Sequence, residues 1–572
     1  MTGSEIQPVD FNRDALTAWG QKDKRNNNWP VVYTINNEKE IYVGETTNAE
    51  LRMRQHLASP SKRSLTRVSV IFDESFNKSV CLDLESHLIK YFHADEKYAV
   101  LNGNGGITDA DYFERAKYRE IFDDIFKQLV DSGQLTRPIP ELINSDLFKY
   151  SPFKALTTDQ AIAIEDVLES LFNSEVQAPI VIQGDPGTGK TIVAVYLIKL
   201  LRDIALSSSE EALDSDSVFA DFFQEGYREQ IQRMEIGLVI PQISLRETLR
   251  RVFKRTPGLS EAMVLEPFEV GMGTKTYDLL IVDEAHRLQQ RNNQPAAERN
   301  IKFREINEDL FGADSTKITQ LDWILKRSNR QIFLLDKAQS VKPADLPSGI
   351  IDALVEKSRS ANTLFRLSSQ MRVSGGEDYI DYVGEILNSR YEGQPKTFGD
   401  YEFRLFDDFG AMNAAIQEKE TQVGLSRLVA GYAWPWISKG PDGASYDFEL
   451  DGVPLKWNGV NKDWINSRTS ANEVGSIHTV QGYDLNYAGV IIGPDLSYDP
   501  AHNQLVFVRE NYHDKKGKEN NPTLGIKYTD SDMLQFVVAI YRVLLTRGVK
   551  GTYVYVVDPE LRKHLRTLIR VI

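Results

Sequence analysis

The sequence predicts an α/β protein in which a small α+β module precedes a larger part made of parallel sheets. From about residue 150 onward, short runs rich in β-branched residues alternate with helical patterns, as in APIVIQG, IGLVIPQ and DLLIVDEAH. Strands separated by helices in this way form parallel sheets that are covered on both faces. The first hundred residues differ, because WPVVYTI and EIYVGET are two short strands joined by the polar turn NNEK. A helix, a strand (RVSVIFD) and a second helix are expected to follow them.

A connecting helix is expected between these two parts. Apolar residues keep a roughly helical spacing from Tyr112 to Leu129, and the helix should end near Gly133, before the prolines of TRPIPEL. The chain is therefore expected to divide into four segments: residues 1–107, 108–150, 151–345 and 346–572.

Two insertions interrupt the larger part. Residues 207–225 hold six acids and no base, which is typical of a solvated loop or lid. Residues 431–470 hold four tryptophans among Gly, Pro and Asp turns, which favours a β-rich excursion. These tryptophans would form either a small core of their own or a surface on which bases stack.

Composition limits the possible functions. The 572 residues include one cysteine, Cys81, which excludes an internal disulfide and a multi-cysteine metal site and favours a reducing, cytoplasmic compartment. No apolar run is long enough to span a membrane, and the first residues are polar and acidic, unlike a signal peptide. The net charge of −15 argues mildly against nucleic acid as a partner, unless the charge is unevenly spread. Five bases and no acid lie between Arg52 and Arg67, so a local phosphate track is compatible with the overall acidity.

A phosphate-binding loop is expected at residues 184–191. The segment GDPGTGKT fits G-x-x-x-x-G-K-[ST] and lies between the strand PIVIQ and the helix TIVAVYLIKLL. Gly184, Gly187 and Gly189 would let backbone N–H groups close around a phosphate, while Lys190 would reach the β/γ oxygens and Thr191 would ligate Mg²⁺.

A pair of acids is the second part of this expected nucleotide site. The strand DLLIVDEAH carries Asp283 at its end, where the carboxylate is placed to hold the Mg²⁺ water shell. Glu284, the next residue, is placed to polarise the attacking water.

Further motifs follow in a fixed order. They are FKALTTDQ ending at Gln160, IPQISLRETL, DKAQS with Gln339, LSSQMR with Arg372, IHTVQG with Gly482, and YRVLLTRG with Arg547. Together with the phosphate loop, this series resembles the superfamily 1 helicases, and in particular the Schlafen-like bacterial group known mainly as a domain of unknown function. The resemblance implies two RecA-like motor domains. It also implies that Gln160 reads adenine, Gln339 senses the γ-phosphate, Gly482 belongs to the motif that couples strand binding to ATP, and Arg372 and Arg547 point at the nucleotide.

The N-terminal module carries its own ordered set of polar residues. Tyr33 ends the triplet VVY and Tyr42 begins the triplet YVG, with Arg52, His56 and Glu85 following. Phosphodiester hydrolysis requires an activated water and positive charge on the developing phosphorane. The tyrosines are placed to orient or deprotonate water, and Arg52 to clamp the phosphate.

Two further features complete this set. Arg52 and His56 are four residues apart on one helix face and are expected to address one phosphate. Glu85 is expected to hold one divalent cation, Mg²⁺ or alternatively Mn²⁺, and Asn102 to tie down the end of the module. The order resembles the GIY-YIG nucleases over about residues 28–107.

The leading hypothesis is an ATP-dependent helicase or translocase fused to a divalent-metal-dependent endonuclease. Its cofactors would be ATP and Mg²⁺, and its partner nucleic acid, DNA in preference to RNA. By resemblance alone, such fusions suggest anti-phage defence or DNA repair. Two alternatives stay open: an ATPase switch that gates a nuclease without processive unwinding, and a nucleic-acid-binding scaffold with an inactive nuclease fold.

Overall fold

The computed structural model of the chain contains two compact units. The first unit comprises Met1–Glu165, Ile192–Met234 and Leu249–Met263, and the second comprises Asp166–Thr191, Glu235–Thr248 and Val264–Ile572. The structure describes residues 3–103, 112–173, 177–207, 219–291, 297–336, 344–369, 373–391, 393–438, 445–460, 464–480, 483–514, 520, 525 and 527–572.

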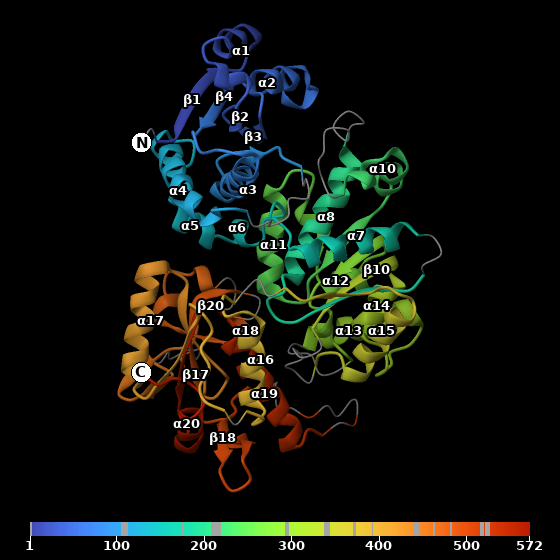
Figure 1. Cartoon of the computed structure of the whole chain (residues 1–572). Coiled ribbons are helices and arrows are strands. Elements are labelled where there is room, and N and C mark those ends of the chain that lie inside the picture. Colours follow the sequence, from blue (N-terminus) through green and yellow to red (C-terminus); the bar gives the residue numbers. More distant parts are fainter. Residues whose placement is uncertain are drawn as a thin grey trace. The chain divides into compact units, whose positions relative to one another are not determined.

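The N-terminal module is a five-stranded mixed sheet in the order β1-β4-β2-β3-β5 (Figure 1). Its strands are β1 (Glu5–Asp10), β2 (Val31–Asn36), β3 (Glu40–Thr46), β4 (Arg67–Phe72) and β5 (Ala99–Val100). Strands β2 and β3 form the expected antiparallel hairpin, in which Tyr33 lies opposite Gly44. The α+β module predicted from the sequence is therefore confirmed.

The structure adds an edge strand that the sequence analysis did not predict. Strand β1 pairs antiparallel with β4 along all six of its residues, and α1 (Arg13–Gly20) follows it. The segment was considered only as a polar N-terminus, because EIQPVD contains few apolar residues and an internal proline. Proline is tolerated in a strand at a sheet edge, and β1 is at the edge.

Helices surround this sheet and connect it to the rest of the first unit. They are α2 (Ala49–Ala58), α3 (Lys78–Asp95), α4 (Arg115–Asp131), α5 (Ile139–Asn144), α6 (Asp146–Lys149) and α7 (Thr158–Phe172). The connecting helix α4 ends just before Gly133, which has a φ of +72°, as expected for a helix C-terminus.

The second unit contains two parallel sheets. The first has six strands in the order β11-β6-β10-β9-β7-β8. These are β6 (Ile180–Gly184), β7 (Ile236–Val239), β8 (Val264–Leu265), β9 (Tyr277–Val282), β10 (Ser328–Leu335) and β11 (Leu364–Leu367). Of the helices between these strands, α8 (Lys190–Leu206), α10 (Glu225–Gln232) and α11 (Ile243–Arg255) lie wholly or partly in the first unit. Helices α12 (Pro267–Met272), α13 (Ala297–Phe311), α14 (Gln320–Lys326) and α15 (Ser348–Ser360) lie in the second.

Strand β11 corrects the boundary expected at residues 345 and 346. It pairs in parallel with β6 from Leu364 to Leu367. Strand β11, and the helix α15 that leads to it, therefore belong with the first sheet and not with the second. The β-α-β connection through α15 brings the chain back to the first sheet, where Leu364 and Leu367 add apolar contacts beside β6. The motif LSSQMR thus begins at the end of a strand of the first sheet.

The second parallel sheet has five strands in the order β12-β20-β17-β13-β16. They are β12 (Glu402–Phe406), β13 (Ser426–Ala430), β16 (Val474–Ser476), β17 (Leu485–Ile492) and β20 (Gly548–Val556). The helices of this part are α16 (Gly376–Leu387), α17 (Phe409–Val423), α18 (Ile477–Val480), α19 (Asp530–Leu545) and α20 (Pro559–Leu565). Two small antiparallel hairpins accompany the sheet: β14 (Phe448–Leu450) with β15 (Val453–Leu455), and β18 (Leu496–Asp499) with β19 (Gln504–Phe507).

The tryptophan-bearing insertion contains the first of these hairpins, and its aromatic residues pack against β12, α17 and β20. Trp457 is fully buried and stacks on Tyr432 with ring centroids 5.6 Å apart, and Trp434 stacks on Phe448 at 4.3 Å. Trp464 is also fully buried. Trp457 packs with Phe406 and Phe409, and Trp464 packs with Ile477 and Val480, so both tryptophans belong to the hydrophobic core around the second sheet instead of forming a separate small core.

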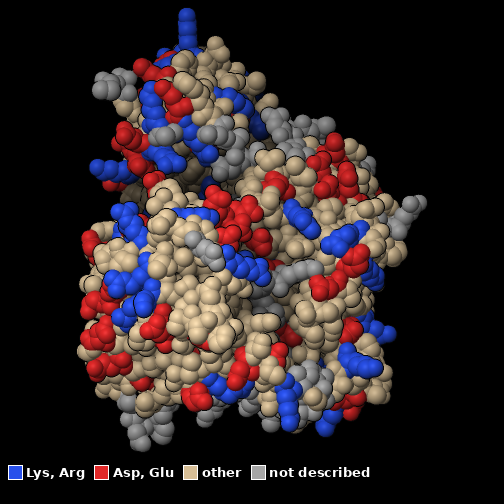
Figure 2. Space-filling model, turned by 60° about the horizontal axis from the view of Figure 1, so that its bottom comes forward, with Lys and Arg blue, Asp and Glu red and all other residues tan. Residues whose placement is uncertain are grey.

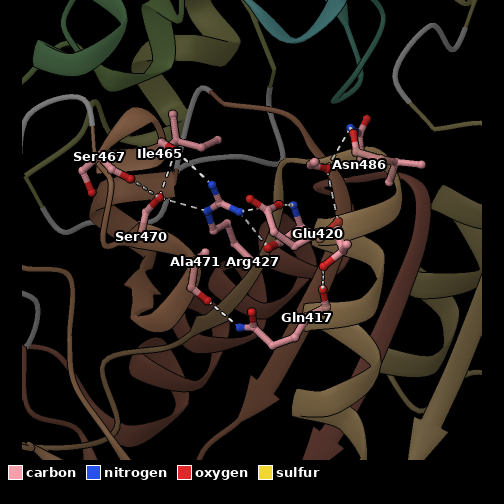
Figure 3. Close-up of polar contacts among 12 residues, drawn as sticks. Gln417, Glu420, Arg427, Ile465, Ser467, Ser470, Ala471 and Asn486 are labelled. Atoms are coloured by element: carbon pink, nitrogen blue, oxygen red, sulfur yellow. Dashed lines mark hydrogen bonds and ion pairs between the residues drawn. The ribbon is translucent and has the colours of Figure 1, made fainter. Parts of the chain in front are cut away.

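A buried arginine anchors the end of this insertion to the second sheet (Figure 3). Arg427, on β13, places its guanidinium 2.6 Å from Glu420 on α17 and donates hydrogen bonds to Ser470 Oγ and to the carbonyl of Ile465. Gln417 on α17 donates a further bond to the carbonyl of Ala471. Because the guanidinium is paired and hydrogen-bonded, its burial is compensated, and it fixes residues 465–471 beside β13.

Charge is mixed over the visible surface. In Figure 2, blue and red side chains are interspersed on the face shown, so the net charge of −15 does not produce a uniformly negative face. Among the helices that the structure describes, none combines the length and the apolar character needed to cross a membrane.

Candidate nuclease and nucleotide sites

Tyr33 is the most deeply buried polar residue of the N-terminal site, and Gly44 makes its position possible. The two residues face each other across the β2–β3 hairpin. A Cβ atom on Gly44 would lie only 2.3 Å from Tyr33 Oη, a separation that side chains do not adopt. The glycine of the YVG triplet is therefore required by the phenol that lies over it.

His56 lies behind Tyr33 and is almost fully buried, with 4% of its surface exposed. Its Nε2 is 2.7 Å from Tyr33 Oη, and its Nδ1 is 2.8 Å from Lys62 Nζ. Both ring nitrogens are therefore occupied by protein groups. The expectation that Arg52 and His56 address one phosphate together is wrong for His56, because burial and these two partners turn it away from solvent.

Tyr42 and Arg52 complete the polar cluster on this side. The Tyr42 ring lies 5.0 Å from the His56 ring, centroid to centroid, and the Lys62 ammonium lies 3.6 Å above the Tyr42 centroid. Burial, and then the charge of Glu85, raise the pKa of Tyr42 to about 12, whereas Arg52 and a hydrogen bond from Tyr33 lower it. Burial likewise raises the pKa of Tyr33 well above its usual value. Both phenols are thus protonated at neutral pH.

Glu85 projects from α3, and nearby charged groups, including Arg52, shift its pKa. Burial, and next the carboxylate of Glu45, raise the pKa of Glu85 to about 8, while Lys78 and Arg52 lower it. Lys78 forms an ion pair with Glu45, at the end of β3. A carboxylate held at this pKa binds a divalent cation only after losing its proton, so cation affinity should rise with pH.

The donor set fits Mg²⁺ or Mn²⁺ bound through few protein ligands. Among the described residues, no group of three or more His, Cys, Asp and Glu side chains is assembled as a metal cage. Mg²⁺ commonly binds through one or two carboxylates together with substrate phosphate and water. Glu85 satisfies that requirement, and a complete protein cage is not needed.

Asn102 has the structural role expected from the sequence. Its side chain accepts a hydrogen bond from the N–H of Val43 at 3.0 Å and donates one to the carbonyl of Val43 at 2.8 Å. This two-point contact fixes the segment after β5 to the middle of the YVG strand.

The phosphate loop follows β6 and leads into α8. Gly187 and Gly189 have φ angles of +89° and +78°, which L side chains rarely adopt. Lys190 Nζ donates hydrogen bonds to the carbonyls of Gly184 and Asp185, at 2.8 and 2.9 Å. The ammonium is thereby folded over the loop, at the position where a phosphate is expected to bind.

Thr191 and Asp283 meet at this loop. Thr191 Oγ1 donates a hydrogen bond of 2.6 Å to Asp283 Oδ2, and Asp283 is fully buried at the end of β9. Burial, and then the adjacent Glu284 carboxylate, raise the pKa of Asp283. A hydroxyl and a carboxylate oxygen at this separation are the donor types that Mg²⁺ prefers, so the two residues fit a nucleotide-bound Mg²⁺.

Glu284 adopts a left-handed backbone conformation, with φ of +50°. His286 Nε2 lies 3.0 Å from Glu284 Oε2, and His286 Nδ1 accepts a hydrogen bond from the N–H of Asp336. Although burial acts in the opposite direction, the hydrogen bond and charge of His286 lower the pKa of Glu284. His286 thus favours the carboxylate form of Glu284.

Two of the remaining predicted nucleotide contacts, Gln160 and Arg547, lie among the described residues. Gln160 is fully buried and accepts a hydrogen bond from the N–H of Thr157, within the first unit. Arg547 is 3% exposed and donates to the carbonyl of Tyr483, beside the second sheet. Gln339, Arg372 and Gly482 lie outside the described residues. The nucleotide roles of these five residues stay predictions.

Comparison with known families matches a domain over each of the two regions that carry these sites. A family model for the Schlafen group 3 DNA/RNA helicase domain matches residues 177–558, which is more than half of the chain. The chain belongs to this Schlafen group 3 helicase family. The GIY-YIG catalytic domain matches residues 30–99, so the Schlafen-type helicase domain and a GIY-YIG domain occur in one chain. The resemblance inferred from the motifs is therefore confirmed.

The Schlafen group 3 chain also resembles individual proteins. The uncharacterized protein YPL245W of Saccharomyces cerevisiae is 29% identical over 408 residues, which cover 68% of this chain and 84% of the yeast protein. The arterivirus nonstructural protein 10 helicase is 12% identical with a TM-score of 0.26, over 70% of this chain and 63% of the viral one. This chain thus spans less than two thirds of that viral protein.

A second solved structure is similarly remote. The Bacteroides Pif1 helicase, in complex with ADP-AlF3 and single-stranded DNA, is 10% identical with a TM-score of 0.24, over 68% of this chain and 91% of that one. At these TM-scores neither solved structure bears on the substrate of the Schlafen group 3 chain.

Proposed function

We propose that this chain is an ATP-dependent nucleic-acid helicase or translocase fused to a divalent-metal-dependent endonuclease. The observation that carries the proposal is that one chain assembles both constellations. Thr191 and Asp283 join at a phosphate loop at 2.6 Å, and Tyr33 and His56 join at 2.7 Å within reach of the charges of Arg52 and Glu85.

At the nuclease site, each residue has a task that its surroundings support. Arg52 neutralises the phosphate, and the protonated phenols orient water and donate to phosphate oxygens. The high pKa values of both tyrosines favour orientation over deprotonation as their role. A cation held by Glu85 would supply Lewis-acid stabilisation of the developing charge.

At the motor site, the loop backbone and Lys190 bind the phosphates, and Thr191 with Asp283 hold Mg²⁺. Glu284 orients the attacking water, and His286 keeps its carboxylate ionised. Arg547 and Arg372 are proposed to complete the site from the second motor domain, with Gln160, Gln339 and Gly482 contributing base recognition and coupling.

The proposal is tested by separating the two chemistries. Glu85→Ala should abolish strand cleavage and leave ATP hydrolysis intact, whereas Lys190→Ala should abolish hydrolysis and leave ATP-independent cleavage intact. Glu120→Ala, at an exposed position of α4, is the matched control. Undiminished cleavage by purified Glu85→Ala would overturn the nuclease site as described.

We propose that the substrate is DNA in preference to RNA. Both are tested, because the matched helicase domain is described for DNA and RNA alike. Labelled single-stranded, duplex and forked DNA and RNA, each with Mg²⁺ or Mn²⁺ and with or without ATP, would decide between them. Anti-phage defence or DNA repair is the biological setting we propose for such a pairing.

A second candidate function, an ATPase switch that gates the nuclease, is favoured by one specific set of contacts. His93, at the end of the helix that carries Glu85, hydrogen-bonds Thr256 just after α11 at 3.1 Å. Its ring also meets Phe153 at 5.2 Å, and the ammonium of Lys199 on α8 lies 5.5 Å from the same Phe153 ring. Helix α8 begins at Lys190 of the phosphate loop. A movement of α8 would therefore change the contacts around Phe153 that hold the end of the nuclease helix.

Strand displacement separates these two candidates. A motor hydrolyses ATP and displaces a labelled strand from a fork. A switch hydrolyses ATP, and its cleavage rate changes with the bound nucleotide, but no strand is displaced.

A further inference from the structure

Lys62 occupies a place in the nuclease site that no motif assigns to it. It ends the short 3₁₀ turn Pro60–Lys62 after α2 and is half-buried. Its Nζ is held by two contacts, at 2.8 Å from His56 Nδ1 and 3.6 Å from the centroid of the Tyr42 ring. The second contact is a cation–π interaction, which favours the ammonium form.

The chemistry of an ammonium group decides which nitrogen of His56 carries the proton. A lysine ammonium has three donors and no acceptor, so Nδ1 of His56 must accept the bond. Burial, and then the charges of Lys62 and Arg52, lower the pKa of His56 to about 2, so the ring is neutral at physiological pH. A neutral ring that accepts at Nδ1 carries its proton on Nε2.

The tautomer in turn sets the direction of the next hydrogen bond. With the proton on Nε2, His56 donates to Tyr33 Oη across 2.7 Å. The Tyr33 proton therefore points away from His56. Arg52 cannot take it, because a guanidinium has no acceptor. The Tyr42 ring lies beside Tyr33, with the two ring centroids 6.3 Å apart.

We propose that Lys62 is a positioning residue that fixes His56 in the Nε2–H tautomer, so that donors run in one direction from Lys62 through His56 to Tyr33. This inference rests on the proposed nuclease function and adds a residue to it. Tyr42, which is only partly buried, becomes the hydroxyl that faces the phosphate and water, while the fully buried Tyr33 stands behind it. In this tautomer the Tyr33 hydroxyl accepts from His56 and keeps its own proton for donation within the site.

The test combines a spectroscopic measurement with kinetics on the full chain. Histidine-selective ¹⁵N labelling and long-range ¹H–¹⁵N correlation report which nitrogen of each ring is protonated, and the His56 signals are assigned by their loss in His56→Gln. The wild type should show the Nε2–H tautomer. Lys62→Arg should retain it, because arginine also only donates, and Lys62→Met should give a mixture or the opposite tautomer.

Cleavage should follow the tautomer. Lys62→Met is expected to lower kcat roughly tenfold or more, the value of one charge-assisted hydrogen bond, with a smaller change in KM. In a His56→Gln background the same substitution should have little further effect, because Lys62 acts through His56. Lys22→Met, at an exposed position of the same module outside the Arg52–Arg67 stretch, is the matched control and should leave tautomer and kcat unchanged.

Three results would overturn the proposal: an Nδ1–H tautomer in the wild type, an unchanged tautomer in Lys62→Met, or kinetic effects of the two substitutions that multiply. The spectroscopic result does not depend on cleavage. If the wild type does not cut any substrate, the nuclease function fails, while the tautomer measurement still decides the role of Lys62.

Discussion

The two phosphate-handling regions of this chain are built in different ways. The nucleotide site is organised by backbone, since a single loop from Gly184 to Thr191 supplies its amides and reaches one distant carboxylate, Asp283. The nuclease site is organised by side chains: those from β2, β3, α2 and the turn after α2 contact one another directly, and Glu85 on α3 acts on them through its charge. A backbone site tolerates changes around it, whereas a chain of side chains fails when any member moves.

Glycine illustrates this difference. Gly187 is needed for its backbone, because φ is +89° there. Gly44 has no such φ, and it is needed because the Tyr33 phenol fills the space where a Cβ would be. The same residue type therefore serves conformation in one site and packing in the other.

Gly44→Ala should have the largest effect on the cleavage rate. If it did not, the contrast between a nuclease site built from side chains and a nucleotide site built from backbone would be wrong. The new Cβ would lie 2.3 Å from Tyr33 Oη and would displace the ring. Because a misplacement of about 1 Å costs roughly 100-fold in rate, cleavage should fall by about that factor or more. ATP hydrolysis, measured on the same preparation, should be unchanged.

Gly226→Ala is the control for this prediction, since no atom lies within 4 Å of a Cβ at that position. Gly187→Ala provides the converse, with loss of nucleotide binding and retention of ATP-independent cleavage. Wild-type cleavage by Gly44→Ala would mean that Tyr33 does not need the position described here.

Acid should weaken the nuclease site through His56, with an effect of intermediate size. Burial, and then Lys62, hold the pKa of His56 at about 2 in the folded chain, against about 6.5 in an unfolded one. Below pH 6.5 the unfolded state therefore takes up a proton that the folded state does not. The contribution of His56 to the free energy of unfolding is therefore at its full value above pH 6.5. It decreases as the pH falls, by about 2 kcal/mol at pH 5.

The measurement is the difference in apparent melting temperature between pH 7 and pH 5. His56→Asn should be less stable than the wild type at pH 7 but should lose less on acidification. Gln55→Asn, which removes no titrating group, should keep the wild-type difference. If His56→Asn loses as much as the wild type, the imidazole is not buried in its neutral form.

The nucleotide site could be predicted from the sequence because its signal is local. Glycines, lysine and threonine at fixed offsets between a strand and a helix define the loop, and an apolar strand ending in two acids defines its partner. The two hairpin tyrosines, Gly44 and Asn102 could be predicted for a similar reason. Their order along the sequence is the order on which the resemblance to the GIY-YIG nucleases rests.

The rest depends on contacts that sequence spacing does not encode. Lys62 was one of five bases in a charged stretch, and nothing in the sequence distinguishes it from Arg63, which is exposed. His56 was placed correctly on its helix, but its burial depends on tertiary packing against Tyr33. The boundary at 345/346 leaves residues 364–367 in the second segment, because the sequence of a strand does not specify which neighbouring strand it pairs with.

The smallest predicted effect concerns the exposed bases of the Arg52–Arg67 stretch. It separates Lys62, which lies within the nuclease site, from the bases on the surface beside it. Arg63 is exposed beside the site, so Arg63→Ala should weaken nucleic-acid binding only about twofold and reduce the salt dependence of log affinity by about one contact. Arg54→Ala should do less, because its guanidinium already pairs with Glu50 and donates to Thr17. Binding titrations over a range of salt concentrations measure both slopes. A larger loss from Arg54→Ala than from Arg63→Ala would show that the phosphate track runs along the other face of α2, away from Lys62 and Tyr42.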